Sequence, residues 1–276
     1  MNSNRKAFVR PDWKIWSPRL EPLPKVPPVT WRISICTVCM RRTRDLRETL
    51  VKNIEENSDY PNLEFVVLNY NSDDDLDAFM LSESIAPYLR IGRVRYLITR
   101  EPKFYATSHS RNVAFNNSTG EIVTNVDADN YTGRGFASYL NRLANIRQHK
   151  VLFTRSKWRN HGRIGMFKSD FYELGGYDED LSGYGWEDYS LMGRALSGGF
   201  TLMWWLRRDV DYSRRIITPK CDVASNMSNQ EWRQTEQSNK EITLKKIANG
   251  DLTANRFRRW GYVGDLQVYG ASLGSR

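Results

Sequence analysis

The first half of the chain alternates short apolar segments with segments of helical periodicity. Within 42–57, for example, Leu46 and Leu50 recur at helical spacing with charged residues between them. We predict strands at 31–38, 63–69, 94–98 and 121–126, and helices at 42–57, 76–88 and 108–117. This alternation predicts an α/β fold, a mostly parallel sheet with helices on both faces. Ligands of such sheets bind at the carboxyl ends of the strands.

We predict a single domain with an arm at its start and an extension at its end. Residues 17–30 contain five prolines, which lack a backbone N–H and favour an extended arm. In the less regular second half we predict helices at 136–147 and 187–196, a strand at 201–206 and a basic loop at 155–163. The predicted regions are an N-terminal arm at 1–30, halves at 31–135 and 136–224, and a C-terminal extension, helical over 231–247, at 225–276.

Charge and hydropathy limit the kinds of binding partner and the cellular compartment that we expect for this chain. The sequence has 41 Lys and Arg against 32 Asp and Glu, and the net charge of +9 favours anionic partners such as nucleotides, nucleic acid, acidic glycans or a lipid surface. No apolar run approaches the roughly 18 residues of a membrane-spanning helix. The basic, polar start lacks the apolar stretch of a signal peptide. We therefore expect neither secretion nor membrane insertion, and a cytoplasmic location.

Cys36 and Cys39 have the spacing of a redox or zinc-binding pair. No second Cys or His pair completes a zinc site, and the two cysteines end an apolar run. We therefore predict buried thiols, which suit a reducing cytoplasm.

An Asp-x-Asp sequence follows the fourth predicted strand directly. Asp127 and Asp129 flank a small residue there, at the edge where ligands of a parallel sheet bind. Hard divalent cations prefer carboxylate oxygens of this kind, and such a cation can neutralise a diphosphate and polarise a leaving group. The alternative is a solvated aspartate turn.

A second unusual segment, at 175–188, is rich in glycine and acidic residues. Its glycines permit backbone turns that other residues rarely adopt, and it ends on Glu187 and Asp188 at the predicted start of a helix. Carboxylates are stabilised at a helix N-terminus, so a capping role is one interpretation. The other is a carboxylate that acts as a general base beside aromatic side chains.

Three features follow one another along the chain: a strand, the Asp-x-Asp, and the motif G-G-x-D-E-x-x-x-G-x-G-W-E-D before a helix. In this order they resemble the sequence of GT-A glycosyltransferases. The resemblance is to the family 2 type with a galactosyltransferase-like C-terminal motif, and it covers about residues 31–213. Supporting matches are the segments at 33–37, 65–72 and 110–112. It implies a GT-A, Rossmann-like fold in which 31–135 binds a nucleotide-sugar donor and 136–224 binds the acceptor.

The resemblance also implies a function and roles for individual residues. The function is metal-dependent, inverting transfer of a sugar from a nucleotide-diphosphate sugar, most typically a UDP-sugar, to an acceptor hydroxyl. Asp129 would bind Mn²⁺ or Mg²⁺ directly, and Asp127 would lie near the metal and the ribose. Asp188 would be the catalytic base, and Glu187 would hold the acceptor. The implied donor-binding residues are Thr37, Arg42, Asn69, Arg111 and Asp127.

Two positions depart from the family pattern. Asn69 stands where family 2 enzymes commonly have an Asp that touches the base. The third metal ligand is often a His after the last helix, and none of the three histidines lies there. Asp209 is the best replacement by position, and an oxygen ligand suits Mg²⁺ or Mn²⁺. The alternative for Asp209 is a surface charge pair.

The acceptor is predicted from basic and aromatic residues. Tyr184, Trp186 and Trp158 could offer flat faces to an acceptor, or they could simply pack in the fold. Basic residues interleaved with aromatics occur around 155–163, 207–215 and 256–259. Such surfaces suit nucleic acid, lipid-linked phosphates or acidic glycans, although they are also typical of a solvated face. We expect either a glycan or a hydroxymethylated DNA base as acceptor.

Two other classes remain open. The first is a catalytically inactive GT-A-like protein that binds nucleotides or polymers, although such relatives usually lose the Asp-x-Asp or the base. The second is a nucleotidyltransferase, which would be expected to carry a glycine-rich basic loop after the first strand. The segment 36–45 is basic but contains no glycine.

Overall fold

The computed structural model describes residues 14–16, 22–25, 27–155, 162–205 and 229–271. In these residues nine strands form one mixed sheet in the order β1-β8-β6-β7-β5-β2-β3-β4-β9. The strands are β1 (Ile15–Trp16), β2 (Ile33–Cys39), β3 (Leu63–Tyr70), β4 (Val94–Thr99), β5 (Ile122–Asn125), β6 (Val151–Arg155), β7 (Ile164–Phe167), β8 (Thr201–Trp205) and β9 (Gln267–Tyr269). The helices are α1 (Thr43–Glu56), α2 (Leu76–Met80), α3 (Ala86–Arg90), α4 (Thr107–Asn116), α5 (Phe136–Ile146), α6 (Lys168–Glu173), α7 (Glu187–Ser197) and α8 (Asn229–Ala248). The predicted α/β class, with a mostly parallel sheet, is confirmed.

The four predicted strands of the first half form the parallel centre of the sheet. β2 pairs in parallel with β3 on one side and with β5 on the other, and β3 pairs in parallel with β4. β3 is buried along its whole length because it is covered on both faces. Its continuous apolar run fits that position, since a strand buried on both faces needs no polar alternation.

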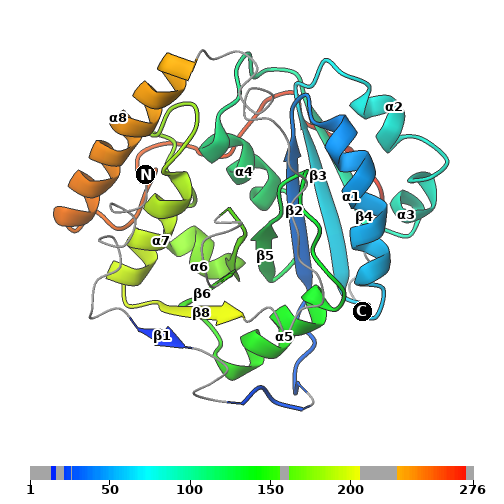
Figure 1. The fold of residues 1–276 in the computed structure, drawn as a ribbon, viewed down its shortest axis with the longest axis horizontal. Coiled ribbons are helices and arrows are strands. Elements are labelled where there is room, and N and C mark those ends of the chain that lie inside the picture. Colours follow the sequence, from blue (N-terminus) through cyan, green and yellow to red (C-terminus); the bar gives the residue numbers. More distant parts are fainter. Residues whose placement is uncertain (1–13, 17–21, 26, 156–161, 206–228, 272–276) are drawn as a thin grey trace.

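The two faces of the sheet carry separate apolar cores. Alternate side chains of β3 point to opposite faces, so Phe65 joins one core and Val66 joins the other. The first core includes α1 and α5, and the second includes α4, α6 and α7. Figure 1 shows α1 and α4 on opposite sides of β2 and β3, as expected for helices on both faces.

Cys36 and Cys39 are buried in the structure, as predicted. Both side chains are fully buried and unbridged, one in each core. Burial raises the pKa of each thiol, most strongly for Cys36, so neither is activated as a nucleophile or a metal ligand.

The helix predicted at 76–88 is wrong in one respect, because the structure divides it into α2 and α3. Pro87 lies in the first turn of α3, where its missing N–H leaves no bond unmade. Within one continuous helix Pro87 would remove a hydrogen bond and clash with the preceding turn. The chain therefore turns after α2 and starts a second helix.

The middle of the chain contributes strands that periodicity did not predict. β7 pairs antiparallel with both β5 and β6, and β6 pairs in parallel with β8. The predicted strand at 201–206 corresponds to β8. The predicted basic loop at 155–163 lies mostly outside the described residues, between β6 and β7.

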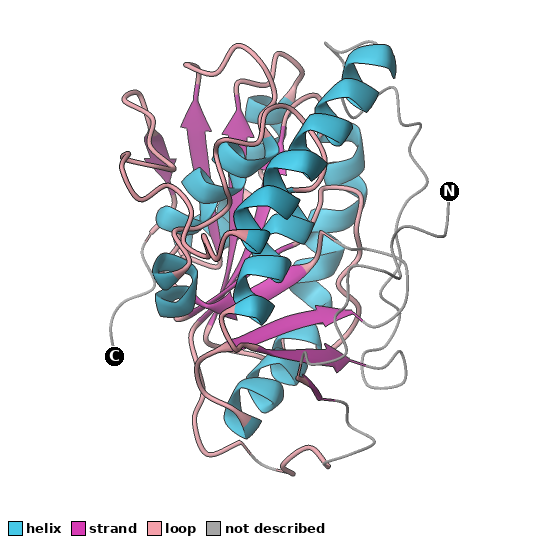
Figure 2. Cartoon of the chain, turned by 90° about the vertical axis from the view of Figure 1, so that its left-hand side faces the viewer, coloured by secondary structure: helices cyan, strands magenta, loops and turns pink. Residues whose placement is uncertain are grey.

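The C-terminal segment returns to the sheet after its predicted helix. The predicted helix at 231–247 corresponds to α8. It lies against α7, on one flank of the molecule (Figures 1 and 2). The chain then runs along α4 and adds β9 antiparallel to β4, at the far edge of the sheet. None of the described helices is long and apolar enough to cross a membrane.

Two adjacent glycines allow this segment to pack closely. Gly175 and Gly176 have φ angles of +69° and +70°. A Cβ on Gly175 would lie 2.0 Å from the Ala254 carbonyl oxygen, and one on Gly176 would lie 2.6 Å from the Trp260 ring. Both positions therefore need glycine for its conformation and for its size.

We predict that Gly175→Ala destabilises the chain more than Gly199→Ala. Gly199 also has a positive φ, of +85°, but no atom lies within 4 Å of its would-be Cβ. Its replacement costs about 1 kcal/mol of backbone strain, whereas Gly175→Ala adds a clash with backbone and should cost more than about 2 kcal/mol. Urea unfolding of both variants measures the difference. Equal losses would contradict the close packing of the C-terminal segment.

Candidate active site

The candidate site lies where the carboxyl ends of β2, β3 and β5 meet at one edge of the sheet. The segment that carries Asp127 and Asp129 begins directly after β5. Thr37 on β2 fixes this segment, because its hydroxyl donates to the Val126 carbonyl oxygen at 2.8 Å. The edge is the one at which ligands of parallel sheets bind.

Arg111 on α4 connects three acidic residues from two distant segments of the sequence, Asp127 and the pair Glu187 and Asp188. Its Nη1 lies 2.5 Å from Asp188 Oδ1 and 3.4 Å from Glu187 Oε1, and its Nη2 lies 3.4 Å from Asp127 Oδ1. The Arg111 side chain is only 6 % exposed, so these contacts are shielded from water. The fold thus brings together four residues that were predicted from separate motifs.

The local fold explains why Glu187 and Asp188 are found here. They occupy the first turn of α7, where the helix N-terminus favours negative charge. Trp186, just before the helix, has a left-handed φ of +69° and follows the glycine-rich turn. Glu187 is buried, and its Oε2 accepts no hydrogen bond from the residues that the structure describes.

The ionisation of the site follows from burial and from an excess of carboxylates. Burial and, to a smaller extent, the charges of Glu187 and Asp127 outweigh the opposing effect of Arg111 and together raise the pKa of Asp188 to about 7. Burial alone would lower the pKa of Arg111, but the neighbouring carboxylates outweigh it and the pKa is raised well above its usual value. Asp188 therefore has the pKa of a group that can exchange a proton near neutral pH.

Asp127 and Asp129 lie in different surroundings. The Asp127 side chain is 42 % exposed and accepts hydrogen bonds from Asn125 and Asn130. Asp129 is only 2 % exposed, and its Oδ2 lies 3.2 Å from Arg42 Nη2. Within the described ranges, no three His, Cys, Asp or Glu side chains are grouped closely enough to hold a metal ion.

Asn69 lies at the carboxyl end of β3 with both of its amide atoms in use. Its Nδ2 donates to Asp77 at 2.7 Å and to the Tyr96 hydroxyl at 2.9 Å. Its Oδ1 accepts from the Ser72 N–H at 2.7 Å and from Arg100 at 3.2 Å. Asn69 is fully buried, so in this structure it orders the loop after β3.

Of the three aromatic residues predicted to contact the acceptor, the structure describes two, Tyr184 and Trp186. Tyr184 and Trp186 are half-buried in the turn before α7, and the Trp186 ring lies 5.1 Å from that of Tyr189. Lys240 on α8 places its Nζ 5.8 Å from the Trp186 ring centroid. Trp158 and Asp209 lie outside the described residues.

The structure adds three residues that the sequence did not single out. Tyr177 is fully buried, with its ring 5.3 Å from the Arg111 guanidinium carbon. Asn125 holds Asp127 at 2.9 Å and donates to the Gly162 carbonyl oxygen at 2.9 Å. A Cβ on Gly162 would lie 2.9 Å from Arg111 Nη2. In the sequence, Asn125 lies just before the Asp-x-Asp and Tyr177 lies in the glycine-rich segment before Glu187. Only their contacts in the folded chain assign them to the site.

Solved structures with a similar fold include several glycosyltransferases. The mannosyltransferase PcManGT from Pyrobaculum calidifontis, in complex with GDP-Man and Mn²⁺, matches with a TM-score of 0.54 and 21 % identity over 73 % of this chain and 60 % of its own. S. aureus TarS 1–349 in complex with UDP-GlcNAc matches with a TM-score of 0.57 and 15 % identity, over 81 % of this chain and 67 % of its own. GalNAc-T7 with UDP, GalNAc and Mn²⁺ matches with a TM-score of 0.59 and 12 % identity, over 79 % of this chain and 50 % of its own.

The chain belongs to glycosyl transferase family 2. The model of that family matches residues 34–179, which include Arg111 and the Asp-x-Asp but end before Glu187 and Asp188. The predicted family, fold and enzyme class are confirmed, and no curated protein sequence matches the chain. The chain spans only 60 % of the length of PcManGT and 50 % of that of GalNAc-T7.

We predict that Arg111→Met destabilises the chain by about 3–5 kcal/mol at pH 8, because it leaves buried carboxylates without a counter-charge. Removal of the arginine raises the folded-state pKa of these carboxylates, so stability is lost as pH rises and the deficit shrinks towards pH 5. Urea unfolding at the two pH values measures this, with the exposed Arg134→Met as control. A deficit that does not change with pH would contradict the charge-compensating role of Arg111.

Proposed function

We propose that this chain transfers a sugar from a nucleotide-diphosphate sugar to an acceptor hydroxyl, with inversion at the anomeric carbon and with a divalent cation, Mn²⁺ or Mg²⁺. The observation that carries the proposal is the position of Asp188, whose carboxylate is bound to Arg111 and grouped with Asp127. Its raised pKa suits a base that accepts a proton near neutral pH.

Residues of the site fit a divalent cation. Three carboxylates surround one guanidinium, and Asp127 presents its carboxylate to solvent. Mg²⁺ is usually held by one or two carboxylates together with substrate phosphates, so a site without three grouped protein ligands is compatible with it. We propose that Asp127 and Asp129 hold the cation. When bound, it would balance the charge of the departing nucleotide diphosphate.

The chain's own residues supply the acid–base and positioning steps. The acceptor oxygen bonds to the anomeric carbon, the bond from that carbon to the diphosphate oxygen breaks, and the acceptor proton passes to Asp188. Arg111 holds the Asp188 carboxylate in place through its 2.5 Å contact. Glu187 Oε2 has no hydrogen-bond partner among the described residues, which supports a role for it in binding the acceptor.

The structural neighbours support the type of donor. TarS and GalNAc-T7 are complexed with UDP-GlcNAc and with UDP, and PcManGT with GDP-Man. We propose a UDP-sugar as the first donor to test and a GDP-sugar as the second. We propose that Thr37 near the end of β2, Arg42 just before α1 and Asn69 near the end of β3 bind the donor. The acceptor is a glycan or a hydroxymethylated DNA base.

The donor and the metal dependence are tested by nucleotide release from UDP-, GDP-, CDP- and dTDP-sugars with Mn²⁺. We expect slow release from one donor that chelator abolishes and that Asp129→Ala loses. Asp59→Ala, at an exposed aspartate after α1, is the matched control. If no donor is hydrolysed and no nucleotide binds with metal, the proposed activity is wrong.

Asp188→Asn should lower the transfer rate by about 10²- to 10⁴-fold, the usual contribution of a general base, while donor binding is retained. In the wild type the rate should fall as pH drops below about 7, because Asp188 is then protonated. Rates and donor affinity across pH 5–9 measure both effects. A variant with the same pH profile as the wild type would exclude Asp188 as the base.

A further inference from the structure

An exposed loop of aromatic and basic residues lies between α8 and β9. We call residues 256–262 the aromatic–basic loop. Phe257 at its tip is fully exposed, and Tyr262 is 48 % exposed. Three arginines, Arg256, Arg258 and Arg259, are exposed beside them. Exposed apolar side chains that are grouped together and rimmed by charged groups are typical of interaction sites.

The backbone of the loop is held firmly although its tip is exposed. Asn255, just before the loop, donates from its side chain to the carbonyl oxygens of Gly175 and Tyr177 at 2.8 and 2.7 Å. The Gly261 N–H donates to Glu179 at 2.7 Å, and the Trp260 ring packs against Phe171. A turn closed by the Arg258 N–H and the Asn255 carbonyl oxygen places Phe257 outward. The loop therefore presents its tip on a backbone that is already ordered, which lowers the cost of binding.

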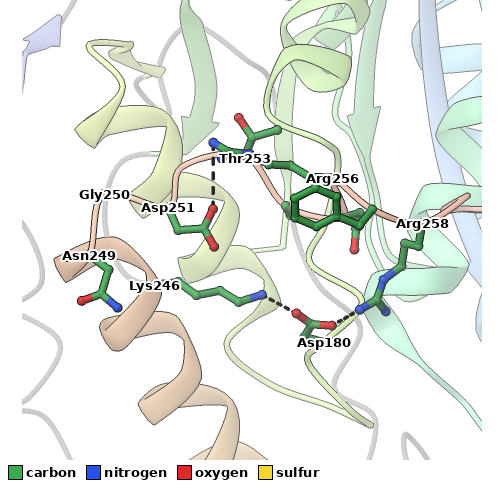
Figure 3. Close-up of a pocket in the computed structure, with 11 residues that line it drawn as sticks. Asp180, Lys246, Asn249, Gly250, Asp251, Thr253, Arg256 and Arg258 are labelled. Carbon is green, nitrogen blue, oxygen red and sulfur yellow. Dashed lines mark hydrogen bonds and ion pairs between the residues drawn. The ribbon is translucent and has the colours of Figure 1, made fainter.

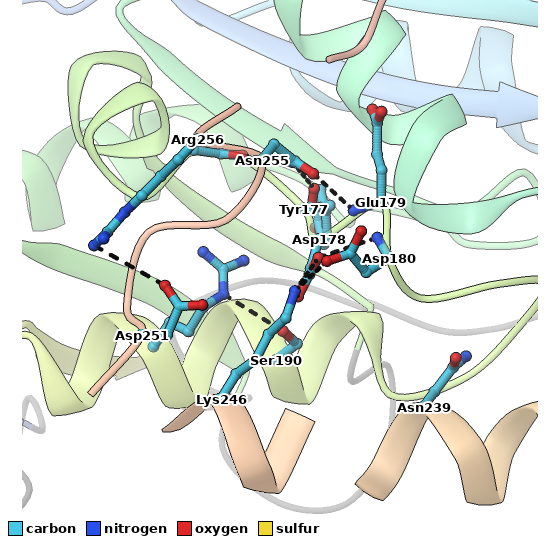
Figure 4. A network of polar contacts seen from close by, with 12 residues as sticks. Tyr177, Asp178, Glu179, Asp180, Ser190, Asn239, Lys246, Asp251, Asn255 and Arg256 are labelled. Carbon is cyan, nitrogen blue, oxygen red and sulfur yellow. Dashed lines mark hydrogen bonds and ion pairs between the residues drawn. The ribbon is translucent and has the colours of Figure 1, made fainter. Parts of the chain in front are cut away.

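Two of the basic side chains of the loop take part in exposed ion pairs. Arg258 pairs with Asp180, and Arg256 lies 4.0 Å from Asp251, with all four side chains more than 40 % exposed. Figure 3 shows Asp180 between Lys246 and Arg258 at a pocket that the loop lines, and Figure 4 shows Arg256 reaching Asp251. Exposed ion pairs contribute little, so a phosphate could replace either carboxylate.

The third arginine is arranged differently. The guanidinium carbon of Arg259 lies 3.4 Å from the centroid of the Tyr262 ring, so the two planar groups form a stack. Together with the Phe257 ring, this stack offers flat faces next to positive charge. Flat faces beside arginines are the features with which proteins bind bases and phosphates of single-stranded nucleic acid.

The loop is anchored to α4, the helix that carries Arg111 of the candidate active site. α4 carries Arg111, and its neighbouring residues His109 and Asn112 contact the C-terminal segment and the turn before α7. His109 Nε2 lies 3.1 Å from the Tyr262 carbonyl oxygen, and Asn112 Nδ2 donates to Glu179. These anchors lie within one helical turn of Arg111, about 5 Å along the axis. The loop and Arg111 are therefore attached to the same helix, α4.

We propose that the aromatic–basic loop binds a single-stranded or locally unpaired nucleic acid and that this polymer carries the acceptor. The second part rests on the proposed function; the binding does not. A lipid surface fits less well, because Trp260 is packed inward and Phe257 alone would enter a bilayer. An acidic glycan would satisfy the arginines but would not use the flat π faces.

The test is fluorescence anisotropy of a labelled 20-nucleotide DNA strand with the whole chain, in 25–200 mM salt. We expect Phe257→Ser with Arg256→Gln to weaken binding about tenfold or more. The same variant should reduce the slope of log K against log salt by about 0.7, the loss of one phosphate contact. The control is Ile91→Ser with Arg90→Gln, which removes an equally charged, exposed pair at the end of α3.

Each outcome decides the proposal. Equal binding by the two double variants, or no binding by the wild type at 25 mM salt, would overturn it. If labelled alginate competes as well as DNA and loses affinity equally in the Phe257 variant, the partner is an acidic glycan and the nucleic-acid assignment is wrong. Donor hydrolysis by the wild type without DNA is measured in parallel. If no donor is hydrolysed and no nucleotide binds with metal, but DNA binding depends on the loop, the proposed function is wrong and the nucleic-acid binding by the loop still stands.

Discussion

The buried guanidinium of Arg111 is the charge on which the candidate site depends. Asp127, Glu187 and Asp188 come from two chain segments, and like charges at this spacing would repel one another in a shielded environment. Arg111 contacts all three at 2.5–3.4 Å and is itself only 6 % exposed. One guanidinium cannot fully neutralise three carboxylates, so the site keeps a negative excess. Burial, together with that excess, raises the pKa of Asp188, and the excess suits the binding of a cation.

The position of Arg111 depends in turn on how the C-terminal segment packs against α4 and the turn before α7. Asn112, next to Arg111, bonds to Tyr177 and Glu179 in that turn. Asp178 in the same turn is buried and paired with Lys246 of α8 at 2.8 Å (Figure 4). A buried carboxylate needs such a partner. The C-terminal extension thus supports the geometry of the active site as well as adding β9 to the sheet.

Much of the fold follows from local sequence patterns. The strands of the first half and helix α1 follow from apolar periodicity, because burial of one helix face or of a whole strand imposes that periodicity. β7 and β9 could not be predicted in this way. β7 is a four-residue strand inside the sheet, and an apolar run this short does not by itself distinguish a strand from a buried helix. β9 is exposed at all three of its positions, so burial imposes no apolar pattern on it.

The sequence by itself determined the class of the protein and the residue types of its chemistry: a parallel α/β sheet, an Asp-x-Asp after a strand and a Glu-Asp pair at a helix start. These features are local, since strand, turn and helix signals act over a few neighbouring residues. The tertiary structure decided which of these groups meet. It placed Arg111 against Asp188, turned Asp129 towards Arg42, buried Asn69 in a network of its own and left Phe257 in solvent. Such pairings join residues tens of positions apart, and only the packing of the two cores fixes their distances.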